Sequence, residues 1–213
     1  MEYRTRYDDQ KAHYRKPIVG LAGGVGAGKS SVAKILVELG AAVIDSDALA
    51  HQELNSDEVK ATLRQWWGDE IFDPDGAVSH QKLAAIIFGD PQQRHRLEAL
   101  LHPRIAVRRE VLISEYESQP RIRMIVLDSP LLYETDLDLM CDAVIFVDSS
   151  LDNRQARSEK QRSWPEGEVA RREKSQLALD TKQARADYVC SNNSSPADLR
   201  REVERIFAAI STT

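Results

Sequence analysis

Gly23-Gly-Val-Gly-Ala-Gly-Lys-Ser30 is the stretch that decides the fold, because it satisfies the phosphate-binding loop pattern G-x-x-x-x-G-K-[ST]. The preceding run, Pro17-Ile-Val-Gly-Leu-Ala22, is typical of a strand, and residues 29–39 have the apolar spacing of a helix. Glycines let the backbone approach a ligand closely, and the start of a helix carries the positive end of its dipole. The segment therefore predicts an oligophosphate site, in preference to a plain turn between a strand and a helix.

Two residues of this loop have expected roles of their own. Lys29 is expected to pair with the β and γ phosphates of a nucleotide, and the hydroxyl of Ser30 is expected to hold a magnesium ion. Such a loop serves switches, motors and kinases alike, so the rest of the sequence must discriminate among them.

Composition restricts the class of protein further. The chain has 213 residues and a formal net charge of -5, which fits one domain with a core and argues against a general nucleic-acid binder. Cys141 and Cys190 lie far apart, so neither a disulfide framework nor a zinc site is predicted. Residues 1–16 are charged and carry no secretory pattern, and no stretch is long and apolar enough for a membrane span. We expect a cytoplasmic monomer or weak homo-oligomer, with residues 1–16 as a flexible extension.

Apolar runs that end in aspartate recur along the chain. Residues 41–44 lead into Asp45-Ser-Asp47, residues 122–128 end at Asp128, and residues 143–148 form a further run. Residues 188–190 give a weaker fifth strand. Parallel strands that alternate with helices predict a doubly wound α/β sheet, whose ligands collect at the carboxyl ends of the strands.

The segments between these strands read mainly as helices. Residues 55–118 are interpreted as a helical insertion into a single domain of residues 17–210, with helix breaks that include Pro103. Residues 152–182 are charged, with interruptions at Trp164-Pro165 and Gly167, and are interpreted as a lid. Trp66 and Trp67 are more typical of the core of the insertion than of an adenine platform. The final helix, 196–210, is expected to pack one apolar face on the sheet: Leu199, Val203, Ile206, Phe207 and Ile210.

The chemistry of the strand ends favours a small-molecule kinase. No asparagine precedes a lysine, so the guanine-reading N-K-x-D segment of a regulatory GTPase is absent. A kinase needs a carboxylate at the acceptor hydroxyl, and Asp45 and Asp47 would share a face if their strand continued through them. Alternatively, Asp47 only caps a helix over residues 48–54. Asp128 is expected to organise magnesium, with a plain strand-ending aspartate as the alternative.

Cationic side chains are the second requirement of a kinase, because charge moves with the phosphoryl group. Arg157, Arg162 and Arg172 follow the strand that ends at Asp148 and are expected to neutralise that charge. A solvated charged helix is the alternative interpretation.

At this point the chain resembles the dephospho-CoA kinase family, from about Ile18 to Ile210. The family's blocks occur here in the expected order: the loop, the Asp-x-Asp segment 43–51, Leu101-His-Pro-Arg-Ile105, Asp128-Ser-Pro-Leu-Leu-Tyr-Glu134, residues 141–147, 172–176 and 182–192. The resemblance implies a three-layer P-loop kinase fold with a helical substrate-binding insertion and a lid. It also implies ATP and Mg²⁺ as cofactors, and phosphorylation of the ribose 3′-hydroxyl of dephospho-CoA, the last step of coenzyme A biosynthesis.

The resemblance also assigns residues. It implies that Asp47 is the catalytic carboxylate and that His51, His102, Pro103 and Asp128 lie on the substrate side. For His102 a core position ahead of a helix break at Pro103 is the alternative. It further implies that ATP is bound by nine residues: Gly23, Gly24, Val25, Gly26, Ala27, Gly28, Lys29, Ser30 and Ser31.

Two departures from the family pattern put specific contacts in question. His80 stands where an arginine is common in the insertion, and Arg154 stands where a glutamine often begins the lid. A kinase of another hydroxyl acceptor, such as a nucleoside, is the nearer alternative function. A nonenzymatic nucleotide switch or ATPase, whose helical insertion binds a protein, is the more distant one.

Overall fold

The computed structural model describes residues 15–162, 167–174 and 176–212. The chain divides into two compact units. The sheet unit comprises the described residues of Met1–Ile44 and Glu115–Thr213, and the helical unit comprises Asp45–Ser114. The helical unit therefore contains most of the expected insertion and adds the ten residues that precede it.

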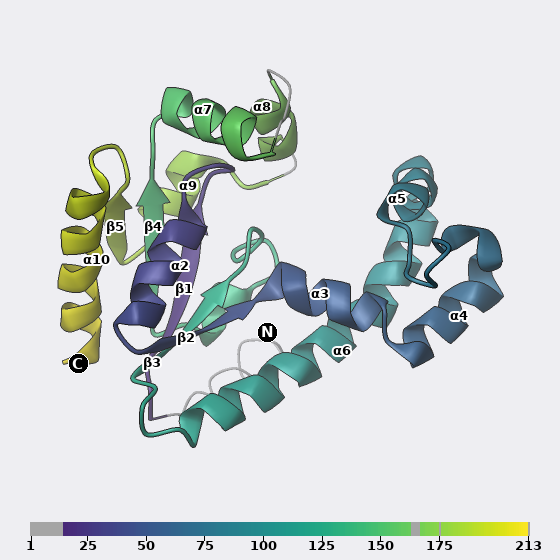
Figure 1. Ribbon diagram of the computed structural model, residues 1–213, viewed down its shortest axis with the longest axis horizontal. Coiled ribbons are helices and arrows are strands. Elements are labelled where there is room, and N and C mark those ends of the chain that lie inside the picture. The colour runs from purple at the N-terminus through teal and green to yellow at the C-terminus, as the bar shows by residue number, and fades with distance from the viewer. Residues whose placement is uncertain (1–14, 163–166, 175, 213) are drawn as a thin grey trace. The chain divides into compact units, whose positions relative to one another are not determined.

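The sheet unit is built on five strands, which the sequence predicted, the weak fifth included (Figure 1). They are β1 (Ile18–Gly23), β2 (Ala41–Asp45), β3 (Met124–Asp128), β4 (Ala143–Asp148) and β5 (Tyr188–Ser191). Their order across the sheet is β2-β3-β1-β4-β5, and β1 pairs in parallel with both β3 and β4. The predicted doubly wound α/β fold is confirmed, and the loop after the central strand begins at the carboxyl edge of the sheet.

Helices cover the sheet because alternate strand residues are apolar on both faces. On one face, α2 (Lys29–Glu38) and α10 (Pro196–Ser211) share a core with β1, β3 and β4. The five α10 residues predicted to face the sheet are all buried. On the opposite face Gly20 lies against Leu132 and Cys141, where an added Cβ would come within 2.7 Å of Leu132 Cδ2.

The start of α10 is set by its own sequence. Ser195 caps its first turn, accepting the Asp198 N–H, while the Asp198 carboxylate accepts hydrogen bonds from the Ser195 hydroxyl and N–H. The same bonds lower the pKa of Asp198. This reciprocal cap explains why the helix begins at Pro196.

The remaining elements of the sheet unit follow β3 and β4. They are the 3-10 turn η2 (Leu137–Met140) and the helices α7 (Leu151–Arg162), α8 (Glu168–Glu173) and α9 (Leu179–Ala184). Gly167 precedes α8 with a φ of 82°, which confirms the predicted interruption there. Trp164-Pro165 lies outside the described residues.

The helical unit has its own apolar core. Its elements are α3 (Ser46–Leu54), α4 (Asp57–Trp67), the 3-10 turn η1 (Asp69–Ile71), α5 (His80–Gly89) and most of α6 (Pro91–Glu117). Trp66 and Trp67 pack against the core, as predicted. Among the described helices of the chain, none combines the length and apolar character that a bilayer crossing needs.

The predicted helix break at Pro103 is wrong, because α6 continues through this residue. Proline removes one backbone donor and crowds the preceding turn, but it does not forbid a helix whose two halves are held by packing. Leu97 before the proline, and Arg109 and Ile113 after it, are buried.

Candidate functional site

The phosphate-binding loop joins β1 to α2 in a conformation that requires glycine. Gly28 has a φ of 95° and stands at the N-cap of α2 without a side-chain cap. A Cβ added to Gly28 would lie 2.1 Å from Asn192 Nδ2, and one added to Gly26 would lie 2.6 Å from the Arg154 carbonyl oxygen. The loop is therefore enclosed by α7 and by the segment after β5, so larger residues are excluded at both positions.

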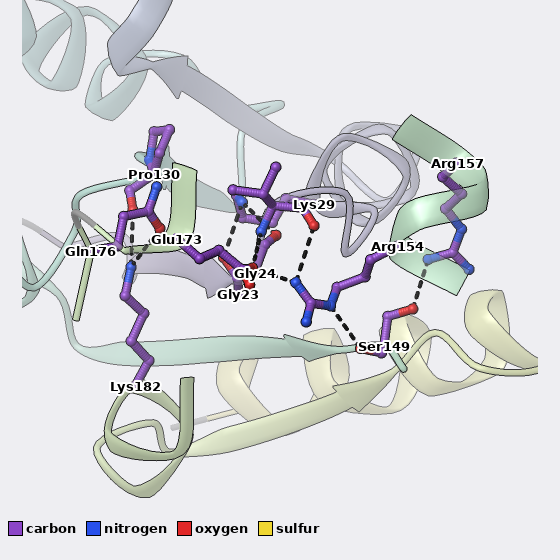
Figure 2. A network of polar contacts seen from close by, with 11 residues as sticks. Gly23, Gly24, Lys29, Pro130, Ser149, Arg154, Arg157, Glu173, Gln176 and Lys182 are labelled. Atoms are coloured by element: carbon purple, nitrogen blue, oxygen red, sulfur yellow. Dashed lines mark hydrogen bonds and ion pairs between the residues drawn. The ribbon is translucent and has the colours of Figure 1, made fainter. Parts of the chain in front are cut away.

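Lys29 is the first residue of α2, and its side chain turns back along the loop (Figure 2). Its ammonium donates hydrogen bonds to the carbonyl oxygens of Gly23 at 3.2 Å and Gly24 at 3.4 Å. The positive charge is thus held beside the turn that the glycines form. This is the arrangement needed to pair with phosphate oxygens.

Hydroxyl and carboxylate groups lie near the same edge of the sheet. Ser30 and Ser31 are exposed in the first turn of α2, and Asp128 ends β3 directly opposite Leu21 of β1. Within the described residues there is no cluster of three or more acidic, histidine or cysteine side chains suited to a metal. Mg²⁺ at a phosphate site uses few protein oxygens, so a hydroxyl and one carboxylate fit it chemically.

Arg157 of α7 contacts the loop backbone directly. Its guanidinium donates to Ala27 O at 3.1 Å, to Ser149 Oγ at 2.9 Å and to Asn192 O at 2.8 Å. The Asn192 side-chain amide donates to the same Ala27 oxygen at 2.8 Å. These contacts favour a positioning role for Arg157, in addition to the predicted neutralisation of transferred charge. The side chains of Arg162 and Arg172 lie outside the described residues.

Replacing Arg157 by alanine is expected to weaken ATP binding about tenfold and to lower the free energy of unfolding by about 1 to 2 kcal/mol, because three hydrogen bonds are lost. Calorimetric titration with ATP and denaturant unfolding would measure the two effects. Arg205→Ala is the matched control, since Arg205 pairs only with Glu202 on the surface of α10 among the contacts described for it. Unchanged ATP affinity in Arg157→Ala would contradict the positioning role.

Arg154, noted only as a departure in the sequence, is buried against the same loop. Its guanidinium donates to Ser149 O at 3.2 Å and to Val25 O at 3.4 Å, and it forms an ion pair with Glu173 of α8. The Glu173 carboxylate also accepts the Val25 N–H at 2.9 Å. Sequence reasoning missed this pair because nothing local links two residues that belong to different helices.

A second ion pair, also missed, supports the segment after β3. The Lys182 ammonium, which is almost fully buried, contacts Glu134 Oε1 at 2.9 Å, Pro130 O at 3.1 Å and Gln176 Oε1 at 3.2 Å. Burial alone would raise the pKa of Glu134, but hydrogen bonds from the Leu177 N–H and from Lys182 outweigh it and hold that pKa below its ordinary value of 4.5. Lys182 thereby ties α9 to the chain that follows Asp128.

Lys182→Gln should lower the free energy of unfolding at neutral pH by about 2 kcal/mol, since Glu134 loses its cationic partner but keeps the Leu177 N–H. A carboxylate with a lowered folded pKa stabilises the fold above pH 4.5, and this stabilisation is lost as the pH falls through the folded pKa. The variant should therefore begin acid unfolding at a higher pH than the parent. Circular dichroism against pH would measure this, with the exposed Lys34→Gln as control; coincident acid transitions would rule the linkage out.

Asp47 lies in the helical unit, in the first turn of α3. The expectation that a strand continues through Asp47 is wrong, and so is the alternative that Asp47 caps the helix. Asp45 is the cap, and its Oδ1 accepts the N–H groups of Asp47 at 2.9 Å and Ala48 at 3.0 Å. Because this carboxylate satisfies the first helical donors, the helix begins at Ser46, and the exposed Asp47 carboxylate is not required for capping.

Asp47 lines a cavity of about 290 Å³ within the helical unit. His51 and His80 line it too, with stacked rings and a 3.0 Å contact between His51 Nδ1 and His80 Nε2. The remaining lining residues are apolar: Ala50, Leu54, Leu83 and Leu101. His102 and Pro103 are exposed on α6, so the interpretation of His102 as a core residue is wrong.

Comparison with known proteins agrees with this geometry. Residues 17–198 match the family model described as dephospho-CoA kinase. Dephospho-CoA kinases of Anaeromyxobacter dehalogenans and Corynebacterium glutamicum are each 36% identical to the chain; both matches cover 90% of it, and 90% and 96% of the respective relatives.

Solved structures share the fold. A crystal structure from Thermus thermophilus has a TM-score of 0.77 at 29% identity and covers 91% of this chain and 97% of its own. A dephospho-CoA kinase from Campylobacter jejuni has a TM-score of 0.65 at 20% identity over 93% of this chain and 99% of its own, which supports the fold alone. With a glycine loop at the centre of the same sheet and a family model that spans most of its length, this chain belongs to the dephospho-CoA kinase family.

Proposed function

We propose that this protein transfers the γ-phosphoryl group of ATP to the ribose 3′-hydroxyl of dephospho-CoA, giving coenzyme A and ADP in the last step of coenzyme A biosynthesis. Family membership supports the reaction. The single observation that carries it in the molecule is the Lys29 ammonium, held 3.2 Å from the Gly23 carbonyl oxygen at the start of the glycine loop.

The nucleotide is proposed to bind along residues 23–31. Backbone N–H groups and the start of α2 receive the phosphates, and Lys29 neutralises the charge that develops during transfer. Ser30 and Asp128 would hold Mg²⁺, which supplies positive charge to the phosphate oxygens when bound. Arg157, Arg162 and Arg172 are proposed to add cationic charge from the lid region 152–182.

Asp47 is proposed to orient the acceptor hydroxyl and to accept its proton. Only three peptide bonds separate Asp47 from Ile44 in the chain, so their Cα atoms lie within about 11 Å of one another. Ile44 lies in β2, two residues before α3 begins. This connection makes Asp47 part of the Asp-x-Asp segment, which the family resemblance assigns to binding of the acceptor hydroxyl.

The helical unit is proposed to bind dephospho-CoA. The cavity beside Asp47 is lined by four apolar side chains and two imidazoles, and its volume of about 290 Å³ suits one portion of the substrate. His51 contributes to it directly. His102 and Pro103 are proposed to contact substrate from the exposed side of α6.

Mass spectrometry tests the reaction. The protein is incubated with ATP, Mg²⁺ and dephospho-CoA, and coenzyme A is expected only when all three are present. An acceptor panel of nucleosides and nucleoside monophosphates, read by ADP release, tests the nearer alternative function. Faster ADP release with another acceptor, or acceptor-independent ATP hydrolysis without coenzyme A, would overturn the assignment.

We also propose a cytoplasmic location and a monomer or weak homo-oligomer that binds neither nucleic acid nor membrane. Cys141 and Cys190 are both buried and form no disulfide, and burial raises the pKa of Cys190 to about 12. Two buried cysteines that remain as free thiols are typical of a protein in a reducing compartment. Sedimentation equilibrium would test the state of association.

A further inference from the structure

A carboxylate from α8 occupies part of the phosphate-binding loop. Glu173 Oε1 accepts the backbone N–H of Val25, the third residue of the loop, at 2.9 Å, and the same oxygen pairs with Arg154 (Figure 2). A Cβ placed on Gly24 would lie 2.7 Å from this oxygen and 2.8 Å from Arg154 Nη1. The Arg154–Glu173 ion pair therefore lies in direct contact with the loop backbone.

The donors around this oxygen are those that recognise phosphate. One is a backbone N–H of a glycine loop and the other is a guanidinium, and both bind carboxylate and phosphate oxygens alike. The side chain of Arg154 is only 7% exposed, so its charge needs an anionic partner wherever α7 lies against the loop. Glu173 supplies that partner in the conformation described here.

Glu173 and a nucleotide phosphate are both anionic, so they compete for these donors. From this arrangement we propose that Arg154 is a further phosphate-binding residue, and that Glu173 is the internal anion which nucleotide displaces from Arg154 and from the Val25 N–H. The inference rests on the proposed nucleotide site at residues 23–31. The inference predicts that removing Arg154 weakens nucleotide binding and that removing the charge of Glu173 strengthens it. In a purely structural ion pair, loss of either partner would have the same effect.

Nucleotide titration without any acceptor tests the proposal. Glu173→Gln keeps the size of the side chain but removes its charge, and it should lower the dissociation constant for Mg-ATP about three- to tenfold, because an internal competitor is weakened. Arg154→Gln should raise that constant about fivefold or more. In the double variant, Glu173→Gln should bring a clearly smaller gain, because only the competition for the Val25 N–H remains.

Matched controls separate competition from general effects of charge and folding. Glu38→Gln removes one negative charge and breaks an ion pair with Arg200 elsewhere in the sheet unit, and it should leave affinity unchanged. Adenosine, which has no phosphate, should bind equally to the parent and to Glu173→Gln. If Glu173→Gln fails to fold by circular dichroism, Glu173→Asp, whose shorter carboxylate reaches Val25 less well, should show a smaller gain in affinity.

Failure of this inference can be told apart from failure of the proposed function, because nucleotide binding and coenzyme A formation are measured separately. Unchanged or weaker Mg-ATP binding in folded Glu173→Gln, or a gain of undiminished size without Arg154, would refute competition even if the parent protein makes coenzyme A. Tighter binding that shrinks when Arg154 is removed, in a protein that makes no coenzyme A, would sustain this inference and reject the proposed acceptor.

Discussion

Lys29→Ala is expected to lower kcat for phosphoryl transfer about a thousandfold, the effect of removing a preorganised donor that stabilises transition-state charge. The Lys29 ammonium lies along the carbonyl groups of Gly23 and Gly24, at the turn where phosphates are proposed to bind. Alanine cannot replace that charge. The initial rate of coenzyme A formation at saturating ATP and dephospho-CoA measures the loss.

Lys34→Ala provides the control for Lys29→Ala. Lys34 lies on the same helix, α2, and is exposed, so its removal changes net charge equally. The control should retain the parent rate, and both variants should give the parent circular dichroism spectrum. Equal rates for Lys29→Ala and the parent would show that Lys29 takes no part in transfer.

Asp47→Asn is expected to have the second large effect. It should lower kcat by a factor of about 10² to 10⁴, which is the usual contribution of a positioned general base. Asparagine keeps the shape of the side chain but cannot accept the hydroxyl proton. The cap of α3 is made by Asp45, so the helix should remain intact. The dissociation constant for ATP should stay within about twofold, since the carboxylate acts on the acceptor and not on nucleotide binding.

The comparison for Asp47→Asn is Asp57→Asn in the same helical unit. Asp57 is exposed in the first turn of α4 and pairs with Lys60 at 3.8 Å on the surface. Its loss should leave kcat unchanged. If Asp47→Asn turns over as fast as this control, another group accepts the proton; if it loses ATP binding instead, the carboxylate serves the nucleotide.

Much of the sheet unit could be predicted because its signals are local. Apolar runs of four to six residues marked four of the strands, a weaker run of three marked the fifth, and the glycine pattern marked the loop. Such patterns reflect the backbone geometry and burial of a few consecutive residues, and these properties depend largely on the residues themselves and their neighbours in sequence. The same is true of the buried face of α10, whose spacing follows a helical period.

Local sequence signals gave wrong predictions at two places, the start of α3 and Pro103. Asp45 and Asp47 both suit a helix cap, and only the observed bonds to the N–H groups of Asp47 and Ala48 identify Asp45. Pro103 disfavours a helix locally, yet α6 is maintained by buried residues on either side of it. At Pro103 packing outside the local pattern decided the outcome, whereas at the start of α3 the backbone selected one of two neighbouring carboxylates.

By itself, the sequence determined the parallel α/β sheet, the phosphate loop between its first strand and the helix that follows, and the residue types available for phosphoryl transfer. Only the tertiary structure decided which charges meet: Arg154 with Glu173, Lys182 with Glu134, and Arg157 with the Ala27 carbonyl. Strands and loops depend on the hydrogen bonding and burial of adjacent residues, and the spacing of apolar residues in the sequence indicates both. Ion pairs join side chains from separate elements, and their partners are fixed only when packing removes those elements from water.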